Sequence, residues 1–177
     1  MSKRGLVVLG VMLLFLATPV RPGGVDSDPK HLPDTHRKLN GVCTVTEALT
    51  WAVGDSGIIL RRGGSPAWQP VDVAGIVQEH WDFHGVSFLN SNIGWVVGEK
   101  NGDPNSHLGI VLKTTNGGQT WFISWPSPPP GVRAIPFSDI HFANQRHGWI
   151  TAGEKYMLRT NDGGYTWVWM LTEGRGG

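Results

Sequence analysis

Two histidines and an aspartate in one short segment come closest to a metal-binding pattern in this sequence. His80 and His84 stand four positions apart in HWDFH, with Asp82 between them. On a helix this spacing would place both imidazoles on one side, where they could bind zinc. The segment leads into a predicted strand, however, and it has neither an HExxH pattern nor an evident third ligand. We therefore predict no metal site and no cofactor, and we interpret these histidines as surface or loop residues.

Cys43 is the only cysteine, so the chain has no internal disulfide framework. A nucleophilic thiol needs a neighbouring base and a lowered pKa, and the sequence around Cys43 identifies neither. We predict a buried, inert thiol and a fold that is stabilised by packing alone.

The composition favours short strands and tight turns. The chain has 177 residues, which favours one domain with a tail, and it is rich in turn formers and tryptophan, with Gly 25, Pro 12 and Trp 9. The formal net charge of +1, with no run of Lys or Arg, gives no electrostatic attraction to nucleic acid. We predict no nucleic-acid partner.

The N-terminus has the pattern of a secretory signal. Lys3 and Arg4 precede an apolar run from Leu6 to Ala17, which is shorter than the roughly 20 residues of a membrane-spanning helix. Residues 1–21 are predicted to be a signal peptide or, if uncleaved, an N-terminal membrane anchor. Residues 22–40 have almost no apolar periodicity and are predicted to be a flexible linker. The expected location is outside the cytoplasm: periplasm, extracellular space or thylakoid lumen.

The rest of the chain contains three degenerate copies of one unit, at about 41–75, 83–126 and 136–172. Similar pieces at a period of about 45 residues indicate blades or solenoid units. Each copy contains a tryptophan strand, an aliphatic strand and a Gly-rich turn before a second tryptophan. The matching pieces are TWAVGDSG (50–57) with IILRRGGSPAW (58–68), GWVVGEK (94–100) with GIVLKTTNGGQTW (109–121), and GWITAGEK (148–155) with KYMLRTNDGGYTW (155–167).

Each copy divides into four short apolar or alternating segments, and four strands are the content of a propeller blade. The predicted strands are Val86–Phe88, Gly94–Gly98, Ile110–Thr114 and Thr120–Ser124 in the second copy, and Asp139–Phe142, Gly148–Gly153, Tyr156–Thr160 and Thr166–Leu171 in the third. Alternation in the first strand of the third copy puts Ile140 and Phe142 on one face. The predicted fold class is all-β, a partial β-propeller of about three four-stranded blades.

The Gly-rich turn between the third and fourth strands is interpreted as structural. Paired glycines can adopt the positive φ angles of a tight turn, and Asp or Asn can accept backbone N–H bonds inside it. The tryptophan after the turn is large enough to fill the gap between neighbouring units. The residues of the two complete turns are Thr114, Asn116, Gly117, Gly118, Thr120 and Trp121, and Thr160, Asp162, Gly163, Gly164, Thr166 and Trp167.

The segment TNDGGYTW (160–167) resembles the Asp-box, or BNR, repeat of sialidase-like β-propellers. The longer string GWITAGEKYMLRTNDGGYTW resembles the photosystem II stability/assembly factor family, over about residues 41–172. The resemblance implies a non-enzymatic scaffold that binds protein partners, such as a subunit of a membrane complex. It also implies more blades than three, and so a fragment of a larger propeller. The first copy departs from the pattern, because RRGGSPAW (61–68) has no Asp or Asn and lacks the first threonine.

An alternative that the Asp-box resemblance leaves open is a sialidase-type glycoside hydrolase, which needs an arginine cluster for the substrate carboxylate and a tyrosine or carboxylate pair near the sugar. Arg133 lies in VRAIP, and Tyr156 and Tyr165 are the two tyrosines. The arginine lies between two copies, and both tyrosines occupy repeat positions. We therefore predict no catalytic residues. A glycan-binding module that uses a tryptophan outside the repeat, such as Trp81 or Trp125, is the other alternative.

Three cations follow the same leucine of the third strand in the three copies: Arg61, Lys113 and Arg159. Equivalent repeat positions should project from the same level of successive blades, so these residues, with Arg62, could form a row that binds an acidic protein segment or a membrane-proximal surface. The alternative is that they are solvated residues of an outer face. Peripheral membrane association of the protein is a further expectation.

Overall fold

The computed structural model describes residues 37–73, 81–100, 108–124, 126–128, 130 and 135–172. The predicted signal peptide or anchor at 1–21 lies outside these residues, as does most of the predicted linker. The linker is shorter than predicted at its C-terminal end, because the first strand begins at Leu39. Within the described ranges no helix is long and apolar enough to span a bilayer.

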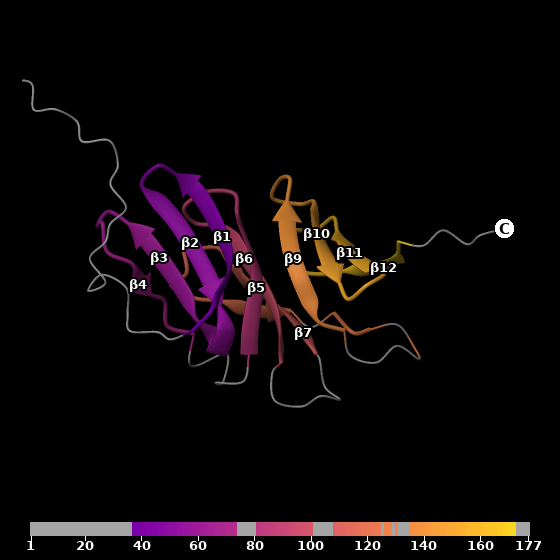
Figure 1. Cartoon of the computed structure of the whole chain (residues 1–177). Helices are drawn as coiled ribbons and strands as arrows, with labels where there is room; N and C mark the ends of the chain where they lie inside the picture. The colour runs from indigo at the N-terminus through magenta and orange to yellow at the C-terminus, as the bar shows by residue number, and fades with distance from the viewer. Residues whose placement is uncertain are drawn as a thin grey trace, which may run out of the picture.

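The described residues form three four-stranded antiparallel sheets, one for each copy of the repeat (Figure 1). Blade one contains β1 (Leu39–Thr46), β2 (Leu49–Gly54), β3 (Ile59–Gly63) and β4 (Gln69–Pro70), with the short helix η2 (Asp55–Gly57) after β2. Blade two contains β5 (Trp81–Phe88), β6 (Gly94–Lys100), β7 (Gly109–Thr114) and β8 (Phe122–Ser124). Blade three contains β9 (Phe137–Phe142), β10 (Gly148–Ala152), β11 (Tyr156–Thr160) and β12 (Val168–Leu171). In each blade the spatial order of the strands follows the chain.

The predicted all-β class and the four strands of each copy are confirmed, whereas several strand bounds differ. The first strand of blade two begins at Trp81 instead of Val86. The fourth strands begin at Phe122 and Val168, after the tryptophan of the turn, and not at Thr120 and Thr166 as predicted. The reason is that the backbone N–H of each of these threonines bonds to the Asn or Asp side chain of the turn, which keeps the threonine out of the strand ladder.

The strand register places the tryptophan of each second strand beside the cation of the third. Trp51 pairs with Arg61, Trp95 with Lys113 and Trp149 with Arg159. The same three tryptophans pair with Cys43, Ser87 and His141 of the first strands. Side chains alternate between the two faces along a strand, and directly paired residues of neighbouring strands point to the same face. These residues therefore share one face of each blade. We call this the leading face, and it is directed toward the next blade along the chain.

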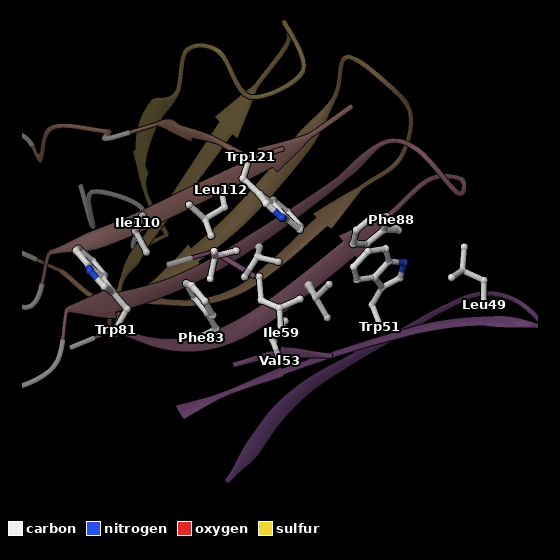
Figure 2. Close-up of a cluster of buried hydrophobic side chains, with 13 residues drawn as sticks. Leu49, Trp51, Val53, Ile59, Trp81, Phe83, Phe88, Ile110, Leu112 and Trp121 are labelled. Carbon is white, nitrogen blue, oxygen red and sulfur yellow. The ribbon is translucent and has the colours of Figure 1, made fainter. Parts of the chain in front are cut away.

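Two hydrophobic cores lie between the blades and join them. The first contains residues from blades one and two, and Figure 2 shows their side chains meeting between the two sheets. From blade one come Trp51, Val53 and Ile59, and from blade two come Phe83, Phe88, Ile110, Leu112 and Trp121. The second core joins Trp95, Val97 and Val111 of blade two to Phe137, Ile140, Phe142, Ile150 and Leu158 of blade three. The burial of apolar area between sheets therefore holds the blades side by side.

A stacked pair of aromatic rings lies at the centre of each core. Trp51 stacks on Phe88 with ring centroids 4.2 Å apart, and Trp95 stacks on Phe142 with centroids 3.4 Å apart. The glycine before the tryptophan makes room for the phenylalanine ring of its own blade, because a Cβ added at Gly148 would lie 2.6 Å from Phe142 Cε1. The Trp51 and Trp95 side chains are therefore structural, as their repeat positions predicted, whereas Trp149 at the same position of blade three is only half-buried.

Candidate functional site

The Asp-box turn of blade three is closed by side chains bonded to its own backbone. Thr160 Oγ1 accepts the N–H of Gly164 at 2.9 Å and donates to Asp162 Oδ1 at 2.8 Å. Asp162 Oδ1 also accepts the N–H groups of Tyr165 and Thr166, each at 3.0 Å. Asp162 Oδ2 accepts the Thr166 hydroxyl at 2.5 Å. The carboxylate is thus saturated with internal donors, which identifies it as a turn-forming group and not as a general base.

These hydrogen bonds also set the protonation of Asp162. Partial burial acts to raise the pKa of this carboxyl. The hydrogen bonds from Thr166, Thr160 and Tyr165 favour the ionised form and outweigh burial, so the pKa falls from 3.8 to about 2. Asp162 therefore carries its charge throughout the physiological pH range.

The Asp-box turn of blade two has the same shape with an amide in place of the carboxylate. Thr114 Oγ1 accepts the N–H of Gly118 at 2.9 Å. Asn116 Oδ1 accepts the N–H of Thr120 at 2.9 Å, and Asn116 Nδ2 donates to the Thr120 hydroxyl at 2.8 Å. The prediction that Asn116 and Asp162 bond to the backbone inside equivalent turns is confirmed.

The second glycine of each box lies against the tryptophan of the preceding blade. Gly118 and Gly164 have φ angles of 83° and 88°. An added Cβ would lie 2.8 Å from Trp51 at Gly118 and 3.0 Å from the Trp95 indole nitrogen at Gly164. The paired glycines are needed both for the positive φ of the turn and for this close approach. Gly117 and Gly163 also have positive φ, at 70° and 80°.

The predicted row of cations is only partly accessible. Arg62 and Arg159 are exposed and Arg61 is half-buried, but Lys113 is only 7% exposed. The Lys113 ammonium lies 3.7 Å from the ring centroid of Tyr165 and 5.9 Å from that of Trp95. Lys113 therefore makes cation–π contacts between blades two and three, so that its charge faces aromatic rings and not solvent. Binding of a partner by Arg61, Arg62 and Arg159 stays a prediction.

The described charges are distributed unevenly between the two edges of the blades. One edge carries the Asp-box turns, and the other carries the loops that join the second strand of each blade to the third. The Asp-box edge has Arg61, Arg62, Lys113, Arg146 and Arg159, with only Glu47 and Asp162 of opposite sign. The far edge has Asp55, Asp72, Asp82, Glu99, Asp139 and Glu154, with Arg37, Lys38, Lys100 and Lys155. Among the described residues the Asp-box edge is therefore basic and the far edge acidic.

The other candidate residues for chemistry have structural contacts or lie outside the described residues. His84 Nε2 lies 3.2 Å from Glu99 Oε1, and the described residues contain no cluster of metal-ligating side chains. His80, Trp125 and Arg133 are not among the described residues. Tyr156 packs edge-on against Trp169 with ring centroids 5.9 Å apart. Both tyrosines of the hydrolase alternative thus contact other residues of blades two and three.

A small apolar cavity of about 120 Å³ lies where blade two meets blade three. Its described lining comes from Leu108 and Gly109, from Pro126 to Pro128, and from Ile135, Phe137 and Trp169. None of these described side chains is ionisable, and the hydroxyl of Ser127 is the one polar side-chain group among them. This cavity could not be predicted from the sequence, because its described walls come from a loop and two separate blades.

One role of the repeated residues was not predicted from the sequence, namely a hydrogen bond between neighbouring blades. Cys43 Sγ accepts the backbone N–H of Phe88 at 3.3 Å, and Ser87 Oγ accepts the N–H of Phe142 at 3.2 Å. The residues that pair with Trp51 and Trp95 thus each provide an acceptor for the first strand of the next blade. The predicted burial of the Cys43 thiol is only partial. The alignment of Cys43, Ser87 and His141 was the available signal, since all three can accept a hydrogen bond.

Three four-stranded sheets stacked face to face, with Asp-box turns against the tryptophan of the preceding blade, define the chain as an arc of an Asp-box β-propeller. Solved structures with this fold include YCF48 bound to a D1 peptide, with a TM-score of 0.61 and 23% identity, covering 78% of this chain and 43% of that one. YCF48 from Cyanidioschyzon merolae has a TM-score of 0.62 and 21% identity, covering 82% of this chain and 43% of that one. The chain thus spans less than half the length of these propellers.

No model of a known protein family matches the sequence, and no curated protein matches it significantly. At 21–23% identity, the similarity to YCF48 establishes the fold. The resemblance to Asp-box propellers that the sequence predicted is therefore confirmed at the level of the architecture.

Proposed function

We propose that this protein is a non-enzymatic propeller scaffold that binds an acidic or extended segment of a protein partner at its basic Asp-box edge. The observation that carries the proposal is the uneven distribution of charge between the two edges. Arg62, Arg146 and Arg159 are exposed on the Asp-box edge, where they can attract and orient a segment of opposite charge.

The fold similarity supports a protein partner. One of the similar propellers was solved with a D1 peptide bound. The sequence resemblance to photosystem II stability/assembly factors points to the same kind of role, assistance in the assembly of a membrane complex. We include in the proposal that the chain is exported and works at the membrane surface, where its partner subunits are displayed.

A binding measurement with matched variants tests the proposal. We expect the full chain to bind a fluorescently labelled D1 peptide, measured by anisotropy at low salt. Replacing Arg62, Arg146 and Arg159 together with glutamine should weaken binding by about tenfold, which corresponds to about 1.4 kcal/mol. Binding should also weaken with added salt, because exposed charges are screened.

The matched control replaces Lys38, Lys100 and Lys155 of the far edge with glutamine, which changes the net charge by the same amount. This control should bind the peptide as the unchanged chain does. Equal loss in both triple variants would show a general charge effect and contradict binding at the Asp-box edge. Binding to anionic vesicles but not to the peptide would instead favour a membrane surface as the ligand.

The enzymatic alternative has a separate test. A scaffold should give no turnover of a fluorogenic sialoside. Turnover that is lost on Arg133→Ala would contradict the scaffold proposal and establish a hydrolase.

A further inference from the structure

The fourth strand of each blade forms its outer edge, and the three outer edges are not alike. β4 is two residues long and contains Pro70, and β8 is three residues long with Pro126 shortly after it. β12 is the longest of the three, and its sequence VWML has neither a proline nor a charge. Short strands, proline and charge are the features with which proteins protect a sheet edge from pairing with another chain. β12 is therefore the least protected of the described outer edges.

This edge lies outside the stacking of the blades. Blades two and three follow β4 and β8 in the chain, and still neither β4 nor β8 pairs with a further described strand. Neighbouring blades meet through their faces instead, where the two hydrophobic cores lie. Within the described residues β12 likewise pairs with β11 alone, at the outer side of blade three (Figure 1). A blade that followed blade three would leave the edge of β12 as open as those of β4 and β8.

The strand register shows which backbone groups this edge presents. The N–H of Thr172 donates to the carbonyl of Lys155, beside β11, at 3.0 Å. Bonded positions alternate along an antiparallel ladder, so Met170 also bonds to β11 whereas Trp169 and Leu171 do not. The N–H and C=O groups of Trp169 and Leu171 consequently point toward the open edge, where they can pair with an added strand.

The apolar cavity between blades two and three lies beside this edge, where blade two lacks the end of its fourth strand. β8 ends at Ser124, opposite Val111, whereas β7 begins two residues earlier at Gly109. Pro126 follows and cannot donate a ladder hydrogen bond, which favours the early end of β8. The space beside Gly109 is thus not filled by a strand. The cavity of about 120 Å³ remains there, with Trp169 of β12 as one of its walls.

The size and the walls of the cavity define what it can hold. An apolar cavity of about 150 Å³ in another protein binds benzene, whereas drug-sized ligands need pockets of roughly 300 Å³ or more. The space of about 120 Å³ therefore suits one apolar side chain, such as leucine. A charged group would find no ionisable partner among the described lining residues. Leu108 and Trp169 are both partly exposed, so a side chain can enter between them from the surface.

We propose that β12 and this cavity together form a binding site for an extended segment of a partner protein. The segment adds to β12 as an antiparallel strand, and its residue opposite Trp169 exchanges backbone hydrogen bonds with Trp169. The Trp169 side chain lies on the face opposite to the leading face, where it lines the cavity. Directly paired residues point to the same face, so the side chain opposite Trp169 points to the cavity as well. A leucine or another aliphatic side chain at this position enters it.

The two parts of the site have different roles. Hydrogen bonds to the main chain of β12 supply affinity for any extended segment, and the cavity selects the side chain. The site is separate from the basic Asp-box edge and needs no charge on the partner. Its failure in the experiment below would therefore leave the proposed binding at the Asp-box edge unaffected.

A second copy of this chain fits the site less well than a single segment. Pairing of two β12 strands would relate two blades by a twofold axis at this edge. Each copy would then bring its own Pro126–Pro128 segment, which lines the cavity beside β12, to the same region. A single extended strand brings no such segment. We therefore assign the site to a partner protein.

A neutral peptide tests the site without using the basic edge. The probe is Thr-Ser-Thr-Leu-Thr-Ser-Thr, acetylated and amidated, added to the full chain with labelled tryptophan. The readout is the NMR signal of the Trp169 indole N–H, assigned by Trp169→Phe. We expect a saturable shift with a Kd of about 1 mM or below. Alanine in place of the leucine of the peptide should raise the Kd by at least about tenfold, because most of the apolar group is lost.

Two N-methylated peptides are the matched pair that tests the pairing with β12. Methylation of the leucine nitrogen removes the N–H that pairs with Trp169 and should raise the Kd by at least about tenfold. Methylation of the next threonine nitrogen removes an N–H that points away from β12, so the Kd should change by less than about threefold. Equal effects of the two methyl groups, or equal binding of the leucine and alanine peptides, would overturn the proposal.

A variant of the chain tests the same edge from the other side. Leu171→Pro removes an N–H that points outward, so blade three should stay folded while the Kd of the peptide rises by at least about tenfold. Leu171→Ala keeps this N–H and should bind the peptide as the unchanged chain does. Equal binding by Leu171→Pro and Leu171→Ala would contradict the addition of a strand to β12.

Two further measurements test the choice of occupant. Benzene that shifts the Trp169 signal while the peptide does not would show a site for free small molecules and overturn the proposal. In sedimentation we expect a monomer at micromolar concentration. A dimer that dissociates on Leu171→Pro would show that a second copy occupies the edge, which would also overturn the proposal.

Discussion

Blade two packs against blade one on one face and against blade three on the other, and the two interfaces have the same packing arrangement. Both have a buried tryptophan stacked on a phenylalanine, and in both an Asp-box glycine lies against that tryptophan. The stacked rings are closer in the second interface, with centroids 3.4 Å apart instead of 4.2 Å. The apolar geometry is therefore repeated, and several equivalent positions of the two cores carry the same type of residue.

The polar groups of the two interfaces differ more. The Trp95 indole N–H donates to Gly163 O, whereas the Trp51 indole nitrogen is buried and has no hydrogen-bond partner among the described residues. Lys113 is covered by Tyr165, whereas the Arg61 Nε atom is buried and no described group bonds to it. The second interface thus pairs the indole of its stacked tryptophan and covers its cation, whereas the box tryptophans Trp121 and Trp167 have buried indole nitrogens without a described partner in both interfaces. From this comparison we expect ring stacking to specify how blades meet, and hydrogen bonds to adjust the stability of each contact.

The largest expected effect comes from removing the stacked tryptophan. Trp95→Ala should destabilise the protein by about 3–5 kcal/mol, because a completely buried indole leaves a cavity. Trp51→Ala should cost about 1 kcal/mol less, since Trp51 contributes no indole hydrogen bond. Urea unfolding measures both free energies. An equal or greater cost for Trp51→Ala would contradict the difference we describe between the interfaces.

The glycine before the tryptophan gives the next largest effect. Gly148→Ala places a methyl group against the Phe142 ring and should destabilise by about 1–3 kcal/mol through overpacking. Gly94→Ala should cost at least as much, because an added Cβ there would lie even closer to the Phe88 ring than one at Gly148 lies to the Phe142 ring. Thermal unfolding followed by near-UV circular dichroism would report both stability and ring stacking. The matched control is Thr50→Ala, which should change stability by no more than about 0.5 kcal/mol.

The sequence predicted what is periodic and local. The turn residues Asn116 and Asp162 were identified correctly because their hydrogen bonds join groups within four residues of each other. The tryptophans were assigned to the core because they recur at the same repeat position. Blade one has Thr44 and Thr50 where blades two and three have a phenylalanine and a glycine. This difference can be read in the sequence, but its meaning depends on the contact between the phenylalanine ring and the glycine, which only the structure shows.

What the sequence could not provide depends on neighbouring blades. Lys113 was predicted to be one member of an accessible row, yet Tyr165, more than 50 positions later, covers it. Burial of this kind depends on packing between units, and a repeat pattern describes only the residues within one unit. The Ser87 acceptor was missed for the same reason, since its partner is the backbone of Phe142 in another blade.

The third prediction uses pH to separate the two Asp-box turns. The pKa of Asp162 is about 2 in the folded chain and 3.8 as its ordinary value. A lowered folded pKa means that the carboxylate stabilises the fold fully above about pH 4 and that this stabilisation is lost as the pH falls through about 2. The contribution should not exceed about 1 kcal/mol, because the group lies near solvent. Urea unfolding between pH 5 and 2 would measure it.

Asp162→Asn is the matched variant, because Asn116 occupies the same position in the other turn. It should remove this part of the acid dependence while keeping the turn closed by amide hydrogen bonds. The reverse change, Asn116→Asp, should add acid dependence to blade two. Acid sensitivity that stays the same in both variants would show that other carboxylates, and not the Asp-box, govern it.

The smallest effect concerns the cation that separates the two interfaces. Tyr165→Gln gives blade three the residue that blade two has at Gln119, and it should destabilise by about 0.5–1 kcal/mol through loss of the cation–π contact with Lys113. The uncovered ammonium should also react faster with an acetylating reagent, which mass spectrometry can follow at Lys113. Gln119→Tyr tests the same contact in the other direction, because it offers a ring to Arg61. If Gln119→Tyr stabilises by a similar amount, the ring over the cation accounts for part of the difference between the interfaces. If Tyr165→Gln leaves the reactivity of Lys113 unchanged, blade packing and not the tyrosine shields that ammonium.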